Sequence, residues 1–342
     1  MVKDKDKGKK ILVTGASGFI GSFLVEGGLE RGMQVWAGVR RSSSRKYLQD
    51  RRIRFAELDF TDSDRLETQL RRHKEEHGGW DCIVHCAGVT KCLDKADFEI
   101  GNYWATRHFI EVLMRLDMVP SQFVYLSSLS VFGPIHERDY RPIVENDTPQ
   151  PNTAYGVSKL HAEEYIRSLQ GFPWVIFRPT GVYGPRERDY YLMAQSIKRH
   201  VDISAGFRRQ DLTFVYVKDL VEAIYRAVER EVTGRAYFVS DGQVYRSRTF
   251  SDLIRRELGN PWLVRFTCPL WLLKAISYVA GNGAKLARKT STLNPDKYRI
   301  MKQRNWRCDI TPLERDLGYQ PRYLLEEGVK ETIEWYKEEG WL

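Results

Sequence analysis

A glycine-rich stretch near the N-terminus constrains the fold more than any other part of this chain. Residues 11–21 read Ile-Leu-Val-Thr-Gly-Ala-Ser-Gly-Phe-Ile-Gly, a short aliphatic run that ends in three glycines spaced three residues apart. This pattern predicts a strand, a tight phosphate-binding turn and the start of a helix. Gly15 would allow the reversal, Gly18 would let the backbone approach a pyrophosphate, and Gly21 would let the helix pack on the strand. The spacing differs by one residue from the usual dinucleotide-binding pattern, so the turn alone is weak evidence.

The second predicted strand, residues 34–39, ends in a basic and hydroxylic loop. A dinucleotide-binding fold usually places an acidic residue there, where it holds the ribose hydroxyls of the adenosine. Here Arg40 and Arg41 are followed by three serines. Arginines suit a 2′-phosphate, which an acid would repel, so we expect NADP, with NAD as the alternative cofactor. A solvated basic loop is the other interpretation of this segment.

Strand-like and helix-like segments alternate through the first half of the chain. We expect strands at 52–58, 82–85, 123–127 and 174–178, and helices at 62–76, 97–118 and 153–169. This alternation predicts an α/β Rossmann fold with a doubly wound parallel sheet. Beyond residue 178 we expect helices at 190–199, 219–229 and 324–341, and a strand that returns at about 235–240.

The chain is therefore expected to have three regions. These are a disordered N-terminal tail at 1–10, an NAD(P)-binding Rossmann domain at 11–184, and a smaller, mostly helical C-terminal substrate-binding lobe at 185–342. The tail is charged and lacks the apolar core of a signal peptide, so we expect a cytoplasmic protein. Five cysteines without a C-x-x-C pair match neither a zinc site nor a disulfide framework, and no metal is expected.

The net charge of +9 is unevenly distributed. Residues 281–308 contain eight basic residues (Lys285, Arg288, Lys289, Lys297, Arg299, Lys302, Arg304 and Arg307) and a single acid, Asp296. The preceding residues 262–280 form an apolar stretch that is too short and too interrupted to span a bilayer. An apolar helix beside a basic segment suits peripheral contact with an anionic membrane, whereas the ordinary alternative is a lobe core beside a solvated helix face. We expect no nucleic-acid partner.

A Y-x-x-x-K pair begins the helix that follows the fifth predicted strand. Tyr155 and Lys159 are four residues apart and share a helix face, so Lys159 is expected to lower the pKa of Tyr155. A phenol with a lowered pKa is a usable general acid or base. Ser128 at the end of the fifth strand would polarise a reacting oxygen. A second pair, Tyr298 and Lys302, has no such strand nearby, and a surface tyrosine and lysine is the alternative reading of either pair.

These motifs are part of a resemblance to a known family that extends over nearly the whole chain. Three further segments contribute to it: Leu126-Ser-Ser-Leu-Ser-Val-Phe-Gly133, Arg178-Pro-Thr-Gly-Val-Tyr-Gly-Pro185 and Phe214-Val-Tyr-Val-Lys-Asp219. The chain resembles the extended short-chain dehydrogenases/reductases of the NAD(P)-dependent epimerase/dehydratase type. The resemblance implies that Ser128, Tyr155 and Lys159 are catalytic, and that the lysine also holds the nicotinamide ribose. It also implies a homodimer formed through the helices at 97–118 and 153–169. Asn102 matches an asparagine of the family, without a clear role.

The expected cofactor-binding residues come from the glycine turn, the ends of the following strands and the catalytic helix. They are Gly15, Ser17, Gly18, Phe19, Ile20, Gly21, Arg40, Arg41, Asp59, Phe60, Ala87, Gly88, Tyr155, Lys159, Pro179 and Val182.

Two departures from the family pattern bear on the substrate. Nucleotide-sugar members resemble one another in an asparagine before Val-Tyr-Gly-Pro and in an Arg-Asp pair before the later strand, where this chain has Gly181 and Leu212-Thr213. A buried diphosphate without its arginine loses charge-assisted hydrogen bonds, unless Arg208 or Arg209 replaces it. The 3β-hydroxysteroid dehydrogenase-like members are resembled instead by the segments at 178–186, 212–217 and 306–309, by Trp335-Tyr336 and by Gly340-Trp-Leu342.

We therefore expect an oxidoreductase that transfers hydride between nicotinamide and an alcohol or ketone carbon of a mainly apolar or lipid-like substrate. The alternatives are a nucleotide-sugar epimerase or dehydratase of the same family, and a catalytically silent NADP-binding sensor. The sensor reading is weakened because such relatives typically lack the tyrosine or lysine, and this chain keeps both.

Overall fold

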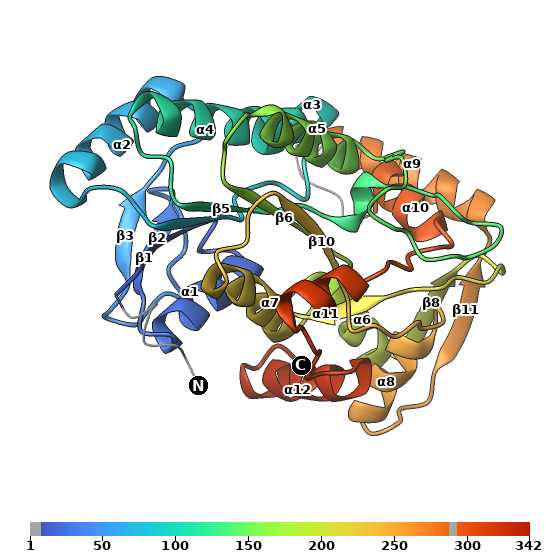
Figure 1. Ribbon diagram of the computed structural model, residues 1–342. Helices are drawn as coiled ribbons and strands as arrows, with labels where there is room; N and C mark the ends of the chain where they lie inside the picture. Colours follow the sequence, from blue (N-terminus) through green and yellow to red (C-terminus); the bar gives the residue numbers. More distant parts are fainter. Residues whose placement is uncertain (1–7, 287–292) are drawn as a thin grey trace.

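The computed structural model describes residues 8–286 and 293–342, with the side chains of 284–286 left out (Figure 1). A seven-stranded sheet lies at its centre in the order β10-β6-β5-β4-β1-β2-β3, and every neighbouring pair is parallel. The prediction of an α/β Rossmann fold is confirmed. The strands are β1 (Lys10–Thr14), β2 (Gln34–Val39), β3 (Arg54–Glu57), β4 (Cys82–His85), β5 (Gln122–Leu126), β6 (Trp174–Pro179) and β10 (Arg235–Val239).

Helices cover both faces of this sheet (Figure 1). Successive residues of a strand point to opposite faces, so Ile11 and Val13 pack toward one layer and Leu12 toward the other. The first layer contains α1 (Phe19–Glu30) and α7 (Val217–Glu229), and the second contains α2 (Ser63–His77), α4 (Ala105–Arg115) and α5 (Ala154–Ser168). Burial on both faces explains why the central strands are continuous apolar runs in the sequence.

The helix expected at 97–118 consists of three joined segments. They are a short α3 (Lys95–Phe98), a π-helical turn η2 (Glu99–Trp104) and α4. A π-helical turn is wider than an α-helical turn, and such turns are frequent at functional sites. Asn102, which lies within η2, is completely buried.

The second half adds a smaller lobe with its own core. That core includes Tyr183, Phe214, Phe250, Val329 and Tyr336. Its helices are α6 (Asp189–Lys198), α8 (Thr249–Glu257) and α12 (Leu325–Glu338), and α11 (Thr311–Leu317) packs against α7 and β10. Two small parallel sheets, which the sequence pattern did not reveal, pair β7 (Gly181–Tyr183) with β9 (Phe214–Tyr216) and β8 (Val201–Ala205) with β11 (Val264–Cys268).

The apolar stretch at 262–280 is not one helix, which corrects the sequence interpretation. Its first part is β11, and its second part belongs to α9 (Leu270–Leu286). Pro269 separates them, since proline cannot donate to a strand ladder and is tolerated in the first turn of a helix. The basic segment then includes α10 (Pro295–Lys302), while Arg288, Lys289 and the side chain of Lys285 lie outside the described residues. Within the described chain, no helix is long and apolar enough to cross a membrane.

Candidate functional site

The glycine turn after β1 has no room for side chains at two of its glycines. Gly15 has a φ of 66°, and a Cβ there would lie 2.9 Å from the backbone nitrogen of Ala87. A Cβ on Gly21 would lie 2.2 Å from the carbonyl oxygen of Gly15. Gly18 is the N-cap residue directly before α1 and has no side chain that would cap the first backbone N–H groups of this helix. The turn therefore presents a helix N-terminus that suits an anion.

A cleft of about 390 Å³ opens at the carboxyl ends of the parallel strands, beside this turn. Its wall includes many of the residues expected to bind the cofactor or the substrate: Gly15, Gly18, Phe19, Ile20, Gly21, Gly88, Ser128, Tyr155, Lys159, Pro179 and Val182. The wall also contains residues that the sequence analysis did not select: Cys86, Val89, Thr90, Leu126, Ser127, Thr180 and Glu187. Open α/β sheets bind their ligands at this edge.

Several residues that we expected to bind the cofactor do not line the cleft. Arg40 and Arg41 are exposed in the loop after β2, and Ser17 is half-buried in the glycine turn. The backbone N–H of Arg40 donates to the hydroxyl of Ser43 at 3.0 Å. Neither guanidinium group forms an ion pair with a carboxylate of the described chain, so both can bind an anion.

Asp59 and Phe60 follow β3 and are engaged by the protein itself. The Asp59 carboxylate accepts hydrogen bonds from the hydroxyl of Thr61 at 2.6 Å and from Arg65 at 2.9 Å. The Thr61 hydrogen bond is the main cause that holds the pKa of Asp59 below its usual value. The ring of Phe60 packs edge-on against Phe109.

Ser128, Tyr155 and Lys159 lie around one cleft, as the sequence motifs predicted. Tyr155 and Lys159 are on α5, where the Thr153 side chain caps the first turn by accepting from the Gly156 N–H at 3.0 Å. Ser128 directly follows β5 and caps the short helix η3 (Leu129–Val131). Its hydroxyl lies 3.0 Å from that of Ser130. A strand end and a helix start therefore hold the three side chains in position.

Burial shifts the pKa values of the tyrosine and the lysine in opposite directions. The Lys159 ammonium donates to the carbonyl oxygen of Leu126 at 2.9 Å and lies 4.8 Å from the ring centre of Tyr125. Burial lowers the pKa of Lys159 to about 8. Burial also raises the pKa of Tyr155 to about 12, and the hydrogen bond with Ser128 offsets only part of this rise. The expected lowering of the Tyr155 pKa by Lys159 is therefore wrong for this structure, because burial of the phenol dominates.

Asn102 connects the loop after β4 to the helix that carries Tyr155. Its side-chain oxygen accepts from the Val89 N–H at 2.8 Å, and its amide nitrogen donates to the Val89 carbonyl at 3.1 Å. The same nitrogen donates to the hydroxyl of Ser158 at 3.0 Å, and that hydroxyl donates to the Tyr155 carbonyl at 2.9 Å. The role that the sequence left open is thus to fix one wall of the cleft.

His85 extends this arrangement beneath the cleft. Its Nδ1 lies 2.9 Å from the hydroxyl of Thr14, and its Nε2 lies 3.1 Å from that of Thr106. The Thr106 hydroxyl donates to the Asn102 carbonyl, and the Thr14 hydroxyl accepts from the Ala87 N–H. These partners assign the proton of the ring to Nε2. Burial lowers the pKa of His85 to about 3, so the ring is neutral.

Two buried hydroxyl groups at the cleft have no hydrogen-bond partner in the described chain. They are Oγ of Ser127 and Oγ1 of Thr180. Buried polar groups are normally paired, so these atoms point to a ligand. The Arg178-Pro-Thr motif was the one sequence signal that pointed toward Thr180.

Glu187 lies in the same wall of the cleft. Its carboxylate accepts hydrogen bonds from the backbone N–H groups of Asp189 and Tyr190 at 2.9 and 2.7 Å.

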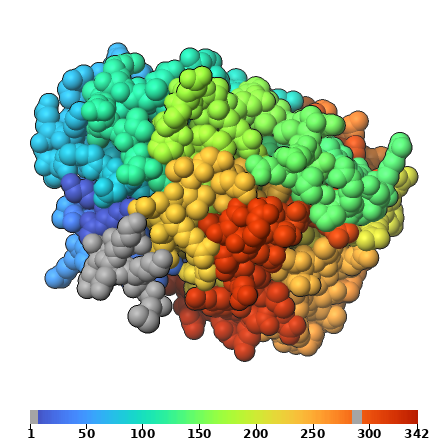
Figure 2. Space-filling view, viewed as in Figure 1, coloured from blue at the N-terminus to red at the C-terminus, as the bar shows by residue number. Residues whose placement is uncertain are grey.

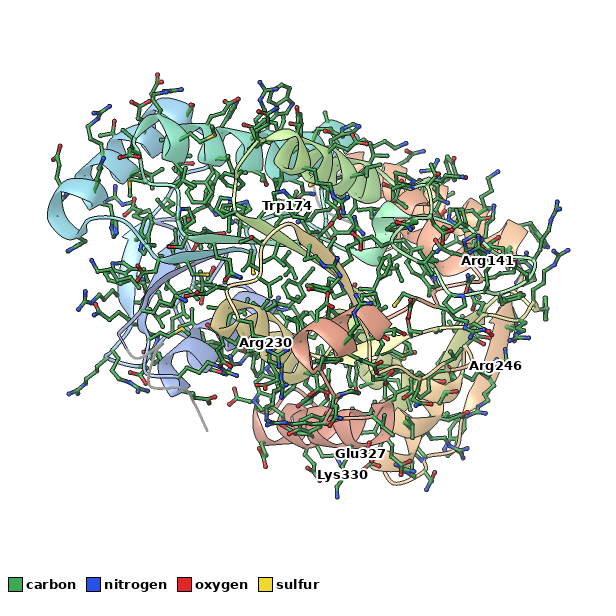
Figure 3. The ribbon with its side chains drawn as sticks, in the orientation of Figure 1. Arg141, Trp174, Arg230, Arg246, Glu327 and Lys330 are labelled. Atoms are coloured by element: carbon green, nitrogen blue, oxygen red, sulfur yellow. The ribbon has the colours of Figure 1, made fainter. Side chains whose placement is uncertain are left out.

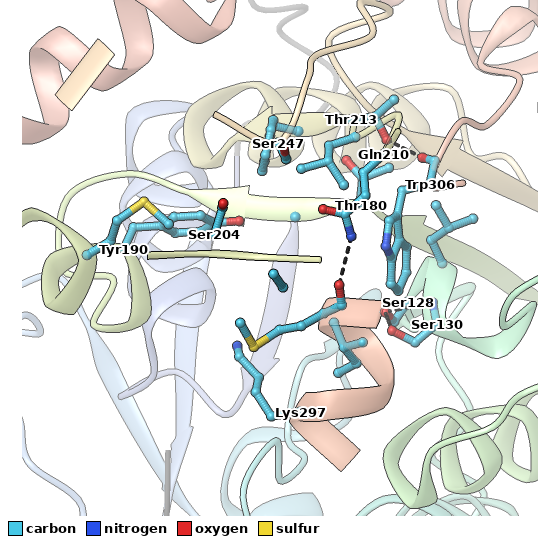
Figure 4. Close-up of a pocket in the computed structure, with 18 of the residues that line it drawn as sticks. Ser128, Ser130, Thr180, Tyr190, Ser204, Gln210, Thr213, Ser247, Lys297 and Trp306 are labelled. Carbon is cyan, nitrogen blue, oxygen red and sulfur yellow. Dashed lines mark hydrogen bonds between the residues drawn. The ribbon is translucent and has the colours of Figure 1, made fainter. Parts of the chain in front are cut away.

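A second pocket of about 360 Å³ joins the cleft and shares Ser128, Pro179 and Thr180 with it (Figure 4). Figure 4 shows Ser128 and Ser130 at one end of this pocket and Tyr190 and Ser204 at the other. Its wall is mainly apolar and includes Met193, Ile203, Leu212, Phe214, Ile300, Met301 and Trp306. A ligand in this pocket would reach the hydroxyl of Ser128.

Lys297 is the only cation among the described residues that line this pocket, and it is already paired. It contacts Asp189 at 3.1 Å, and Lys91 contacts the same carboxylate at 2.5 Å. Burial alone would raise the pKa of Asp189, but the two ammonium groups outweigh it and hold this pKa below its usual value. The three residues connect the loop after β4, α6 and α10.

The loop arginines considered as diphosphate ligands do not line the pocket. Arg208 is exposed, and Arg209 forms a bidentate pair with the buried Asp211 at 2.8 and 2.7 Å. Arg246, which is labelled in Figure 3, contacts the same carboxylate. Asp211 therefore already forms ion pairs with Arg209 and Arg246.

Comparison with known proteins places these features in a family. The model of the NAD dependent epimerase/dehydratase family matches residues 11–240. The uncharacterized protein YbjS of Escherichia coli is 27% identical, with 97% of this chain and 98% of that protein covered. A UDP-glucose 4-epimerase of Vibrio cholerae is 24% identical, with 97% and 96% covered. A 3 beta-hydroxysteroid dehydrogenase/Delta 5-->4-isomerase of Mycobacterium tuberculosis is also 24% identical, with 96% and 90% covered.

Solved structures share the fold over nearly the whole chain. The dTDP-glucose 4,6-dehydratase of Bacillus anthracis, solved in complex with NAD, superposes with a TM-score of 0.75. It is 19% identical, and the match covers 98% of each chain.

Proposed function

Because the chain belongs to the NAD dependent epimerase/dehydratase family, we propose that it is an NAD(P)-dependent oxidoreductase acting on an alcohol or ketone carbon of a mainly apolar substrate. The observation that carries this proposal is the apolar pocket that meets the cleft at Ser128. The described residues of its wall include no arginine, which is the side chain that best binds a diphosphate. The similarity to the mycobacterial hydroxysteroid dehydrogenase supports the same substrate class.

The cleft fits a dinucleotide. The glycine turn packs tightly on the protein's own backbone at Gly15 and Gly21, and the uncapped start of α1 at Gly18 lies in the cleft wall and suits a pyrophosphate. Ser127 and Thr180 contribute buried hydroxyls that have no hydrogen-bond partner among residues 8–286 and 293–342. The exposed arginines Arg40 and Arg41 favour NADP over NAD, because they can bind a 2′-phosphate.

The residues of the site suit proton transfer to a substrate oxygen. When bound, the nicotinamide ring supplies or accepts the hydride. Ser128 orients the substrate oxygen, and Tyr155, whose pKa of about 12 keeps it protonated at neutral pH, donates the proton during reduction. Lys159, with a pKa of about 8, is charged at neutral pH and offsets the negative charge of the phenolate that forms.

A nucleotide-sugar epimerase or dehydratase is the second candidate. The similarity to the Vibrio cholerae epimerase favours it, since the match covers nearly the whole of both chains. In this case Lys297 would have to leave Asp189 in order to contact a diphosphate in the pocket.

Substrate panels and a Tyr155→Phe variant test the proposal. We expect NADPH oxidation with apolar ketones and no conversion of UDP-glucose or dTDP-glucose. Tyr155→Phe should reduce turnover at least about a hundredfold and leave cofactor affinity nearly unchanged, because only the hydroxyl that transfers the proton is removed.

Tyr165→Phe is the matched control for this variant. Tyr165 lies on the same helix α5 and lines neither the cleft nor the substrate pocket. Full turnover in Tyr155→Phe would refute the assignment of the site, and conversion of a nucleotide sugar would favour the second candidate.

A further inference from the structure

The small sheet of β8 and β11 exposes an apolar face. In its parallel register Val201 pairs with Val264, and Ile203 pairs with Phe266. These four side chains are 37%, 58%, 58% and 50% exposed, respectively, whereas the intervening Asp202 is buried. Alternate residues of a strand share one face, so the sheet presents four neighbouring apolar side chains to solvent.

Helix α9 directs apolar side chains away from the protein in the same region. Trp271, Ala275, Tyr278 and Val279 are exposed and form one stripe at spacings of four, three and one residues. Leu273 and Ser277 on the other side are buried, and Gly281 packs against Pro295 of α10. A surface helix normally turns its apolar stripe to the core, and this one also exposes Trp271 and Val279 by more than 70%.

The sheet surface adjoins the substrate pocket through Ile203, α9 follows β11 directly, and these elements gather at one end of the molecule (Figure 1). Ile203 and Met193 line the pocket and are themselves exposed, so the pocket opens to solvent beside them. Ile300 and Met301 of α10 form another part of the wall, and α10 packs against α9. We call the exposed residues of the sheet and helix the apolar face: Val201, Ile203, Val264, Phe266, Trp271, Ala275, Tyr278 and Val279.

Cations without ion-pair partners accompany the apolar face. They are Lys198 and Arg199 just before β8, Arg208 just after it, Lys274 on α9 and Lys302 at the end of α10. All five are exposed, and none contacts a carboxylate in the part of the chain that the structure describes.

The charge selects between possible occupants of this face. A symmetric contact with a second copy would bring the same cations against one another, which is unfavourable. Anionic lipid head groups attract basic side chains, and the apolar side chains can enter the boundary between head groups and acyl chains.

We propose that this end of the protein docks on an anionic membrane surface, with the mouth of the substrate pocket facing the lipid. The enzyme then takes an alcohol or ketone that resides in the membrane, and this statement about the substrate rests on the proposed function. A mainly apolar substrate concentrates in the bilayer, so a pocket that opens at the docked face spares the substrate a passage through water.

Co-sedimentation with vesicles tests the docking without cofactor or substrate. We expect binding to phosphatidylcholine vesicles that contain phosphatidylglycerol, weaker binding at high salt, and little binding to phosphatidylcholine alone. The double variant Trp271→Glu/Val279→Glu should bind at least about tenfold more weakly, because two exposed apolar side chains no longer enter the membrane.

The control is Val119→Glu together with Leu324→Glu. These changes add the same charge at two other exposed apolar positions outside the apolar face. The control variant should bind vesicles like the wild type, and circular dichroism should show that both variants are folded.

Three outcomes would overturn the proposal. They are no binding to anionic vesicles at low salt, equal loss of binding in the control variant, and a Trp271→Glu/Val279→Glu variant that only converts a dimer into monomers. An activity measurement separates this proposal from the proposed function. With one apolar ketone, Trp271→Glu/Val279→Glu should lose activity on vesicle-embedded substrate and keep it on detergent-solubilised substrate. Vesicle binding without any ketone reduction would refute the proposed function and leave the docking supported.

Discussion

Tyr155 and Lys159 illustrate how burial prepares single residues for proton transfer. Burial disfavours the charged form of each group, which raises the pKa of the phenol to about 12 and lowers that of the ammonium to about 8. Both groups are therefore protonated at neutral pH. A protonated phenol is a general acid, so the resting pair is suited to reduction of a carbonyl.

At the same scale, the choice of cofactor depends on two arginines. Replacing Arg40 and Arg41 by alanine should shrink the preference for NADPH over NADH by roughly 5- to 150-fold, because charge-assisted hydrogen bonds to a 2′-phosphate are lost. Fluorescence titration with both nucleotides measures this preference. Arg45→Ala is the control, since Arg45 belongs to the same loop but stacks on Phe55. Equal affinity of the wild type for NADPH and NADH would rule out the NADP assignment.

Among the elements, the π-helical turn η2 has a specific role in the site. Its wide turn places Asn102 where it holds both backbone groups of Val89 and the hydroxyl of Ser158. The loop after β4 and helix α5 are thereby connected through one buried amide. In a regular α-helix, the side chain of Asn102 would point in a different direction relative to the following turn.

Asn102→Ala should destabilise the protein and loosen the cleft together. The two Val89 backbone groups lose their partner, which should lower the free energy of unfolding by about 1–3 kcal/mol. Cofactor affinity should also fall, because the displaced loop lines the cleft. Denaturant unfolding and cofactor titration measure the two effects, and Ser158→Ala, which removes a single contact of the amide, should have the smaller effect. Unchanged cofactor affinity in Asn102→Ala would argue against a role in positioning the cleft.

The same elements show what the sequence could and could not predict. The buried strands β4, β5 and β6 are continuous apolar runs, and the glycine turn and the Tyr155–Lys159 spacing identified the cleft. Strands β8 and β11 escaped because each carries a charged residue, Asp202 or Arg265, between exposed apolar ones. Glu187 was missed since tertiary packing alone brings it to the cleft, whereas Ser127 stands beside Ser128 at the end of β5 and was passed over in its favour. The pKa of Tyr155 depends on burial, which motif spacing does not report.

At the scale of the whole molecule, a second apolar surface lies away from the proposed membrane-docking end. Ile100, Trp104 and Met114 of η2 and α4 are 53%, 41% and 48% exposed, respectively. They lie on the layer of helices that covers the upper side of the sheet in Figure 1. Exposed apolar side chains along one helical layer suit a contact between helices of two subunits.

We propose that the protein forms a homodimer through the helical layer of α4 and α5. Sedimentation velocity at micromolar concentration should show a species of about twice the 40.0 kDa chain mass. Trp104→Glu together with Met114→Glu should convert it to monomers, because two charges would be buried in the contact. The Trp271→Glu/Val279→Glu variant should remain a dimer. A single 40.0 kDa species for the wild type would contradict this assembly.

The path of the chain through the central sheet affects how the protein is made. Strand β10 pairs with β6, and α7 contacts α1 through the hydroxyl of Tyr225 on the Leu24 carbonyl. The C-terminal segment, red in Figure 2, packs in turn against the gold segment around residue 230. During translation, the first half of the chain therefore leaves the ribosome before α7 can pack beside α1 and before β10 can pair with the edge of the sheet at β6. Open edges invite pairing with other chains, so a nascent chain stalled before residue 235 exposes the edge of β6, which the finished protein pairs with β10 and flanks with α11.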